Sequence, residues 1–349
     1  MRQFNIRTLF ALICVTSTTP TFAQTCVGDI AIDNRIDGGD LGVMLANWGP
    51  VTSTALSRAC DLDGNAIVNG ADLGILLSGW GICPGPAVPA WATLIEAQPD
   101  PAVVTNSALR AAIVATGMAW RVRDTGTGIE MLLVPPGTFQ MGCSEGSQQH
   151  SGCRQSEIPV HSVALTNAYY LGRYEVTQAQ WLATMPANPS SFQSYSDSAN
   201  RPVEQITWEP LQTYLLATSM RLPSEAEWEY ACRAGTTSPF YNGSSDENTV
   251  NFLAWCCGGI GSQTHVVGGK LPNALGFYDM LGNVWELVND WYGAYSADAQ
   301  MNPLGPTAGA GQPHVMRGGD VFQPAGNLRS SYRDAVSYGN CGFRVARNP

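Results

Sequence analysis

The stretch "FYDMLGNVWEL", residues 277–287, is the most informative segment of the chain, because an apolar, aromatic segment has no packing reason to carry two carboxylates. Asp279 and Glu286 stand seven residues apart in it, with Gly282 between them. A general acid–base pair needs carboxylates in two different environments across a cleft. Two carboxylates in one tight loop converge more readily on a single cation, and calcium takes mixed carboxylate and carbonyl ligands. The segment therefore predicts a calcium site, with an ion-free acidic turn as the alternative.

The regular elements expected around this segment are short. Residues 131–142, "MLLVPPGTFQMG", are typical of two strands around a Pro-Pro-Gly turn. Residues 222–235, "LPSEAEWEYACRAG", predict a helix that starts near Ser224 and ends at Gly235. Glycine and aromatic residues are frequent throughout this part of the chain, which indicates a domain rich in turns and loops.

Eight landmarks occur in order between about residue 118 and residue 347. They are "GTFQMG", "IPVHSV", "YEVTQAQW", "RPVEQITW", "RLPSEAEWEYACRAG", "NALGFYDMLGNVWEL", "VMRGGD" and "GFRVA". Together they resemble the formylglycine-generating enzyme, or sulfatase-modifying factor, family. The resemblance implies a modified C-type-lectin-like α+β fold with little regular secondary structure over residues 118–349, and a structural calcium ion. The implied calcium ligands are the side chains of Asp279 and Glu286 and the backbone carbonyls of Gly282 and Val284.

Authentic members of this family oxidise a sulfatase cysteine to formylglycine with copper(I) and molecular oxygen. The resemblance places two copper-binding cysteines shortly after a Gly-Gly turn that corresponds to residues 318–319. This sequence instead has Gln323 and either Asn327 or Leu328 near those places. Copper(I) requires soft thiolates, which amide and alkyl groups do not replace. We therefore expect no copper cofactor and assign no catalytic residue.

Two functions of different class remain after this departure from the family pattern. In the first, the chain is an active oxidoreductase that converts a sulfatase cysteine to formylglycine through altered metal ligation. In the second, the domain is a non-catalytic, lectin-like module that binds a protein or peptide in its groove. The adjacent Cys256 and Cys257 are poorly placed to hold a metal within one short loop, and the four histidines show no ligand spacing. The missing thiols favour the second function.

A repeat lies near the amino terminus, where residues 28–49 align with residues 60–81 at a period of 32. In the later copy, the ligand positions of a calcium loop are held by Asp61, Asp63, Asn65, Ile67 (through its carbonyl), Asn69 and Asp72. In the earlier copy, the matching acidic residues are Asp29, Asp33, Asp37 and Asp40. An apolar helical stripe follows each loop, so a helix is expected directly after each predicted ion site.

Both copies resemble dockerin modules, whose paired loops each end in aspartate. The resemblance implies a small helical, EF-hand-like module at residues 24–83 that binds structural calcium. It also implies a protein partner, either cohesin-like or on a cell surface. The departures from the pattern are Ala31 at a ligand position and Ala66 at the usual glycine. An acidic turn before a helix, without an ion, is the alternative.

The start of the chain and its charge bear on where the protein works. Residues 1–23 combine Arg2 and Arg7 with an apolar run and end at a small residue. This pattern predicts a cleaved signal peptide and a secreted, periplasmic or extracellular protein. Loss of the two arginines takes the net charge from −10 to −12, which disfavours nucleic acid and anionic membranes as partners. No later run is long enough to span a membrane, and a proline-rich stretch opens a predicted linker at residues 84–117.

Export makes disulfides the expected state of the cysteines. Cys143 and Cys153 flank a polar loop between strand landmarks, which predicts a bond between them. The family resemblance implies a second bond, between Cys232 on the 222–235 helix and Cys341 near the carboxyl end.

Four arginines gather near the carboxyl end of the sequence. They are Arg317, Arg329, Arg333 and Arg344. One interpretation is a groove for an anionic ligand, since arginine gives planar, bidentate recognition. The other is buried pairing with carboxylates of the domain, which we favour for Arg344.

Overall fold

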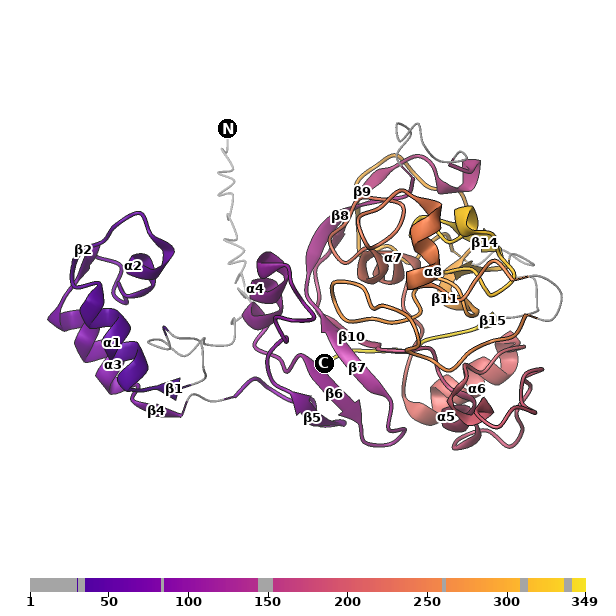
Figure 1. The fold of residues 1–349 in the computed structure, drawn as a ribbon, viewed down its shortest axis with the longest axis horizontal. Helices are drawn as coiled ribbons and strands as arrows, with labels where there is room; N and C mark the ends of the chain where they lie inside the picture. The colour runs from indigo at the N-terminus through magenta and orange to yellow at the C-terminus, as the bar shows by residue number, and fades with distance from the viewer. Residues whose placement is uncertain are drawn as a thin grey trace, which may run out of the picture.

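The computed structural model describes residue 30 and residues 35–82, 85–143, 153–258, 262–307, 313–335 and 341–349. These residues form a small N-terminal module and a large domain, each with its own hydrophobic core (Figure 1). The predicted signal peptide and the predicted ligands Asp29 and Asp33 lie outside the described residues. Within the described ranges, no helix is both long enough and apolar enough to cross a membrane.

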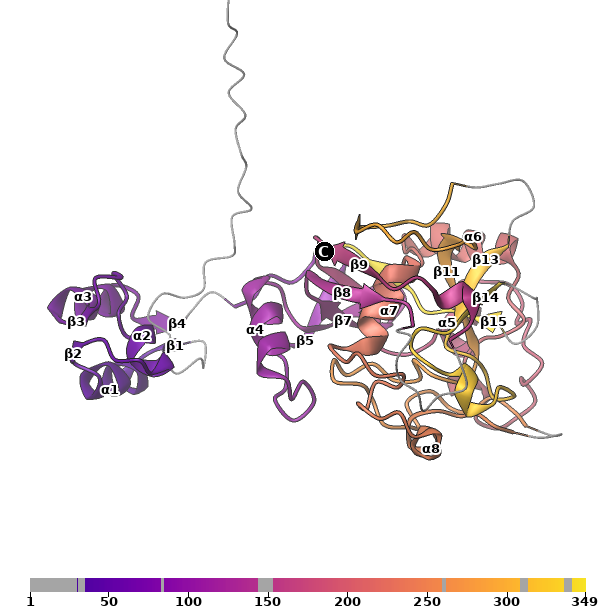
Figure 2. The same ribbon diagram turned by 90° about the horizontal axis from the view of Figure 1, so that it is seen from above.

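The N-terminal module builds one structural unit twice, at the 32-residue period of its sequence. Its elements are β1 (Arg35–Ile36), α1 (Gly38–Ala46), β2 (Gly49–Pro50), α2 (Ala55–Ala59), β3 (Ile67–Val68), α3 (Gly70–Ser78) and β4 (Gly81–Ile82). The strand before each helix pairs antiparallel with the strand after the other helix, as β1 with β4 and β3 with β2. Met44 of α1 and Leu76 of α3 are fully buried in the shared core, and the two helices lie side by side (Figures 1 and 2). The two copies therefore form one packed unit.

Most of the predicted linker belongs to the large domain. β5 (Ala92–Glu96) pairs antiparallel with β6 (Arg121–Asp124) at the edge of a five-stranded sheet. α4 (Ser107–Ala115) buries Ile113 in the core of the large domain. The linker prediction for residues 84–117 is therefore wrong from β5 onward, because these elements are too short and too exposed to show a clear period in the sequence.

The remaining elements of the large domain are short strands and helices. The strands are β7 (Glu130–Val134), β8 (Gly137–Met141), β9 (His161–Leu165), β10 (Tyr169–Gly172), β11 (Trp285–Trp291), β12 (Gln300–Met301), β13 (His314–Arg317), β14 (Arg333–Ala335), β15 (Cys341–Gly342) and β16 (Ala346–Arg347). The helices are α5 (Gln178–Leu182), α6 (Trp208–Thr218), α7 (Glu225–Arg233) and α8 (Val250–Leu253), with single helical turns at residues 155–157, 198–200, 247–249 and 325–327. The sheets have the orders β16-β10-β7-β6-β5, β14-β13-β11-β15 and β12-β9-β8. This mixture confirms the α+β class.

Helix α7 is almost wholly buried and packs against β8, β11 and β13. Its start is fixed by a reciprocal cap: the Ser224 hydroxyl accepts from the Glu227 amide (3.2 Å), and the Glu227 carboxylate accepts from the Ser224 amide (2.8 Å). Left-handed residues Ala234 (φ 47°) and Gly235 (φ 88°) end it. The helix predicted at residues 222–235 is confirmed.

The 277–287 segment is a left-handed turn that leads into β11. Asp279, Gly282 and Asn283 have φ values of 53°, 81° and 60°. A Cβ at position 282 would lie 2.4 Å from the carbonyl oxygen of Trp255, so only glycine fits there. The Gly282 amide donates to the carbonyl of Gly318 (2.9 Å). The turn thus joins three segments that are distant in sequence.

Candidate functional site

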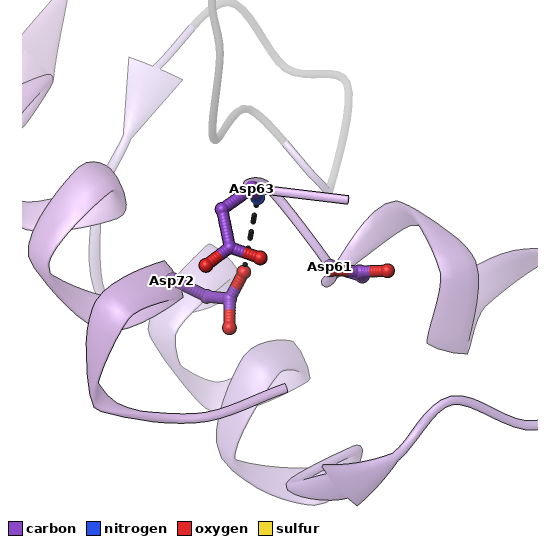
Figure 3. A group of neighbouring side chains, drawn as sticks. All are labelled: Asp61, Asp63 and Asp72. Atoms are coloured by element: carbon purple, nitrogen blue, oxygen red, sulfur yellow. Dashed lines mark hydrogen bonds between the residues drawn. The ribbon is translucent and has the colours of Figure 1, made fainter. Parts of the chain in front are cut away.

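The later loop of the N-terminal module brings three carboxylates together. Asp61, Asp63 and Asp72 each offer an oxygen within 4.8 Å of the others, and Figure 3 shows the carboxylates of Asp63 and Asp72 facing one another. Asp72 is fully buried at the start of α3. Burial raises the pKa of Asp72, but hydrogen bonds from the backbone amides of Asn69, Asp63 and Leu62 outweigh it and lower the pKa overall. Three carboxylates at this separation fit a calcium ion.

The other predicted ligands of this loop lie in its turns. The Asn65 amide donates to both Asp61 (3.0 Å) and Asp63 (3.0 Å), which fixes the two carboxylates at the start of the loop. The Ile67 carbonyl accepts from the side chain of Asn69 (3.0 Å). All six predicted positions therefore lie within residues 61–72, which run from the loop into the first turn of α3.

The earlier copy repeats part of this arrangement. Asp40 takes the place of Asp72: it is fully buried and accepts from the amides of Ile30 (2.6 Å) and Asp37 (2.9 Å). Asp37 caps α1 by accepting from the amide of Gly39 (2.8 Å). In the part of the chain that the structure describes, the later loop is the one cluster of three acidic, histidine or cysteine ligands.

In the large domain, Glu286 is the acceptor of a buried ion pair. The Nε and Nη2 atoms of Arg344 each donate to a different oxygen of Glu286 at 2.6 Å, and Trp228 Nε1 donates to Oε2 at 2.7 Å. The predicted buried pairing of Arg344 is confirmed. Both oxygens of Glu286 are thus already engaged, which leaves it a poorer calcium ligand than the sequence indicates.

Asp279 and a third carboxylate, Glu175, lie beside this ion pair. Asp279 accepts from the Gly268 amide (2.6 Å) through Oδ2, while its Oδ1 is buried without a hydrogen-bond partner among the described residues. Burial raises the pKa of Asp279 to about 6, and burial together with the charges of Asp279 and Glu286 raises that of Glu175. Glu175 also accepts from the Val284 amide (3.2 Å). A cation at Asp279 would satisfy its orphaned oxygen and offset the excess negative charge.

Glu175 was not predicted from the sequence. It lies in the landmark "YEVTQAQW", about 100 residues before the turn that it supports. A glutamate between the aromatic Tyr174 and the apolar Val176 is a signal of a buried acid. The residues around Glu175 in the sequence, however, do not indicate which distant segment this acid contacts.

The segment after Gly318 and Gly319 occupies the place implied for the copper site. Gln323 accepts from the side chain of Asn327 (2.8 Å), so the two amides are joined by one hydrogen bond. Leu328 is fully buried, and a Cβ on Gly319 would lie 2.3 Å from it, so the leucine packs directly onto the Gly-Gly turn. This donor set does not fit copper(I), which requires thiolates.

The other three carboxyl-terminal arginines are also buried in ion pairs. Arg317 pairs with Glu229, Arg329 with Glu157 and Arg333 with Glu225. Each of these arginines is no more than 4% exposed. Buried carboxylates therefore neutralise the positive charges of these arginines inside the domain, and the interpretation as an anion groove is not supported.

The structure decides both predicted disulfides. Cys143 and Cys153 are bonded, with Cα atoms 5.7 Å apart, which confirms the first. Cys232 is a free, buried thiol, so the predicted Cys232–Cys341 bond is wrong. The sulfur of Cys341 instead lies 3.7 Å from the thioether sulfur of Met316.

The surroundings of Asp290 predict that the stability of the large domain depends on pH. Asp290 lines a cavity of about 210 Å³, accepts from the Glu225 amide (2.8 Å), and has its pKa raised to about 7 by burial and by the charge of Glu225. A raised pKa means that this group contributes full stability below about pH 4 and loses it as the pH rises towards 7. Asp290→Asn, which mimics the neutral acid, should therefore leave stability unchanged at pH 4 and raise it by about 2–4 kcal/mol at pH 8.

Urea unfolding of both proteins at pH 4 and pH 8 checks this prediction. An Asp290→Asn protein that is less stable than the parent at pH 8 would contradict it.

Comparison with known proteins agrees with this fold. A family model described as the sulfatase-modifying factor enzyme 1-like domain matches residues 120–349. The chain is 27% identical over 286 residues to the formylglycine-generating enzyme of Mus musculus, covering 62% of this chain and 74% of that protein. It is 30% identical over 251 residues to the serine/threonine-protein kinase pkn1 of Chlamydia pneumoniae, covering 63% of this chain. The match spans only 38% of that chlamydial protein.

Two solved structures are similar to the large domain. Treponema denticola variable protein 1 matches with a TM-score of 0.55 and 27% identity, over 63% of this chain and 95% of that one. PvdO from Pseudomonas aeruginosa matches with a TM-score of 0.53 and 26% identity, over 66% and 98%. The matched family model and the ordered landmarks cover the same residues, and the chain belongs to the sulfatase-modifying factor family.

Proposed function

We propose that this protein is an exported member of the family whose large domain binds a protein or peptide and does not oxidise cysteine by the copper mechanism. One observation carries the proposal: the positions after Gly318 and Gly319 hold a hydrogen-bonded amide pair, Gln323 and Asn327, and a packed Leu328. The half-exposed Phe322 beside them offers an apolar contact for a ligand. Export rests on the signal-peptide pattern of residues 1–23.

The N-terminal module, in this proposal, is a dockerin-like calcium module that docks onto a cohesin-like or cell-surface protein. The acidic loop before α3 supports calcium. Support for a partner comes from four half-exposed apolar side chains that repeat at the 32-residue period: Leu45, Trp48, Leu77 and Trp80. Large exposed tryptophans of this kind are typical of docking surfaces.

A second calcium site is proposed at the 277–287 turn, through Asp279, Glu286 and the carbonyls of Gly282 and Val284. The orphaned Oδ1 of Asp279 supports it. The ion pair of Glu286 with Arg344 argues that Asp279 is the principal side-chain ligand.

The alternative function, oxidation through altered metal ligation, has one observation in its favour. The Cys257 amide donates to the Gln323 carbonyl (3.0 Å), so two thiols lie on the chain segment next to the implied copper position. The pKa of Cys256 is raised to about 12 by burial and by its neighbour Cys257, which disfavours the thiolate that a soft metal needs. We therefore retain the binding function.

Copper titration tests the choice between the two functions. We expect no copper(I) binding that competes with a bicinchoninate-type chelator, and no aldehyde on a sulfatase-derived cysteine peptide, because no thiolate pair lies at positions 323 and 328. Copper binding would be followed by absorbance of the chelator complex, and turnover by peptide mass. Stoichiometric binding that is lost in Cys256→Ser, together with aldehyde product, would establish the alternative function instead.

A further inference from the structure

The loop that carries Cys256 and Cys257 is fixed on both sides. Trp255 accepts from the Asn283 amide (2.9 Å) in the left-handed turn. On the other side, the backbone amide of Cys257 donates to the Gln323 carbonyl (3.0 Å), and the amide of Gly258 donates to the Val321 carbonyl (2.9 Å). The two cysteines therefore sit on an anchored backbone.

The two cysteines are adjacent in the chain, and the neighbouring Cys257 contributes, after burial, to the raised pKa of Cys256. Cys257 is exposed, and its φ of 60° places it in the left-handed region, whereas Cys256 is half-buried. Cys60 and Cys232 are buried, so within the described residues Cys257 is the thiol most open to a reagent in solution.

We propose that Cys256 and Cys257 form a vicinal dithiol that closes to a disulfide by exchange with a low-molecular-weight disulfide. The proposal goes beyond the binding function and does not depend on it. In the first step, the Cys257 thiolate attacks one sulfur of oxidised glutathione, forming a mixed disulfide and releasing one glutathione as its thiol after protonation. In the second step, the Cys256 thiolate attacks the Cys257 sulfur and expels the second glutathione. Two protein thiols are oxidised, and one glutathione disulfide is reduced to two glutathione thiols.

The surroundings set the order and the reversibility of these steps. Burial raises the pKa of Cys256 to about 12, so Cys256 is the slower, resolving thiol. Consecutive Cα atoms lie about 3.8 Å apart, closer than in an ordinary disulfide, and such a tight ring is easily reduced. The product is a reversible oxidation site on the surface that borders Gln323.

The test uses the full chain treated with oxidised glutathione, quenched with an alkylating agent, and mapped by mass at the peptide that contains residues 256–257. We expect this peptide to lose two hydrogens, to carry no glutathione, and to return to the dithiol form under a mild thiol reductant. Cys256→Ser should trap a stable glutathione adduct on Cys257. Cys257→Ser should react at least about tenfold more slowly, because Cys256 is half-buried.

Buried Cys232 serves as the internal control and should remain unmodified in every sample. Two outcomes would overturn the proposal. One is a parent protein that keeps a glutathione adduct at Cys257, as Cys256→Ser does; the other is a parent protein in which both cysteines stay fully open to alkylation after treatment.

Discussion

Replacing Glu229 with glutamine should lower the free energy of unfolding of the large domain by about 3–5 kcal/mol. Glu229 is fully buried on α7, where it accepts from Arg317, from Arg233 Nε (2.9 Å) and from the Gly142 amide (2.9 Å). Burial alone would raise its pKa, but the charges of Arg233 and Arg317 lower it overall, so the ionised form is held. The amide keeps the shape of the side chain but leaves the buried charge of Arg317 with the more distant carboxylate of Glu225, at 3.7 Å, in place of its close partner.

Urea unfolding followed by tryptophan fluorescence checks this result. The control is Glu209→Gln, an exposed glutamate in the first turn of α6, for which we expect a change of less than about 0.5 kcal/mol. Combining Glu229→Gln with Arg317→Met should cost less than the sum of the single changes, because the second change removes the stranded charge. A loss below about 1 kcal/mol for Glu229→Gln would contradict the argument.

Removal of calcium should destabilise the N-terminal module by roughly 3 kcal/mol when the ion stands at about 100 times its Kd. Asp63→Ala is the sharpest test, because Asp63 is the exposed member of the carboxylate group, whereas Asp72 is buried and bonded to the backbone. In chelator the variant should melt close to the parent. In calcium it should lose the stabilisation that the parent gains.

Calorimetry with and without chelator separates the two proposed calcium sites. Asp279→Ala should remove a calcium response of the large domain only, and Asp63→Ala that of the module only. Asp298→Asn, at an exposed aspartate of the large domain, is the matched control and should change neither. Identical melting curves of the parent protein with and without chelator would exclude both sites.

Local signals in the sequence predicted the parts of the fold that local chemistry determines. The cap of α7 at Ser224, for example, is made by Glu227, only three residues further along the chain. Ala66 is instructive, because it adopts the left-handed φ of 67° that the usual glycine takes freely. The loop therefore keeps its shape despite the substitution, at a cost in backbone strain.

The errors arose where the outcome depends on distant partners. The carboxylates of Glu175 and Asp279 come near one another only when the domain is folded, and no local sequence pattern indicates this proximity. The Cys232–Cys341 bond was carried over from the family, but here Cys232 is a free, buried thiol and the Cys341 sulfur lies 3.7 Å from that of Met316. β5 was assigned to a linker because an edge strand forms through its pairing with a neighbouring strand, here β6, and the residues of β5 alone do not show that pairing.

The crossed strand pairing of the N-terminal module makes its two halves interdependent. β1, in the earlier copy of the repeat, pairs with β4, which follows the helix of the later copy. β2 of the earlier copy and β3 of the later copy make the reciprocal pair. A chain cut between the copies would leave each half with two unpaired strands and half of a hydrophobic core. We therefore expect an ion bound at the proposed later site also to hold the earlier loop in shape, so that both loops unfold in a single cooperative step.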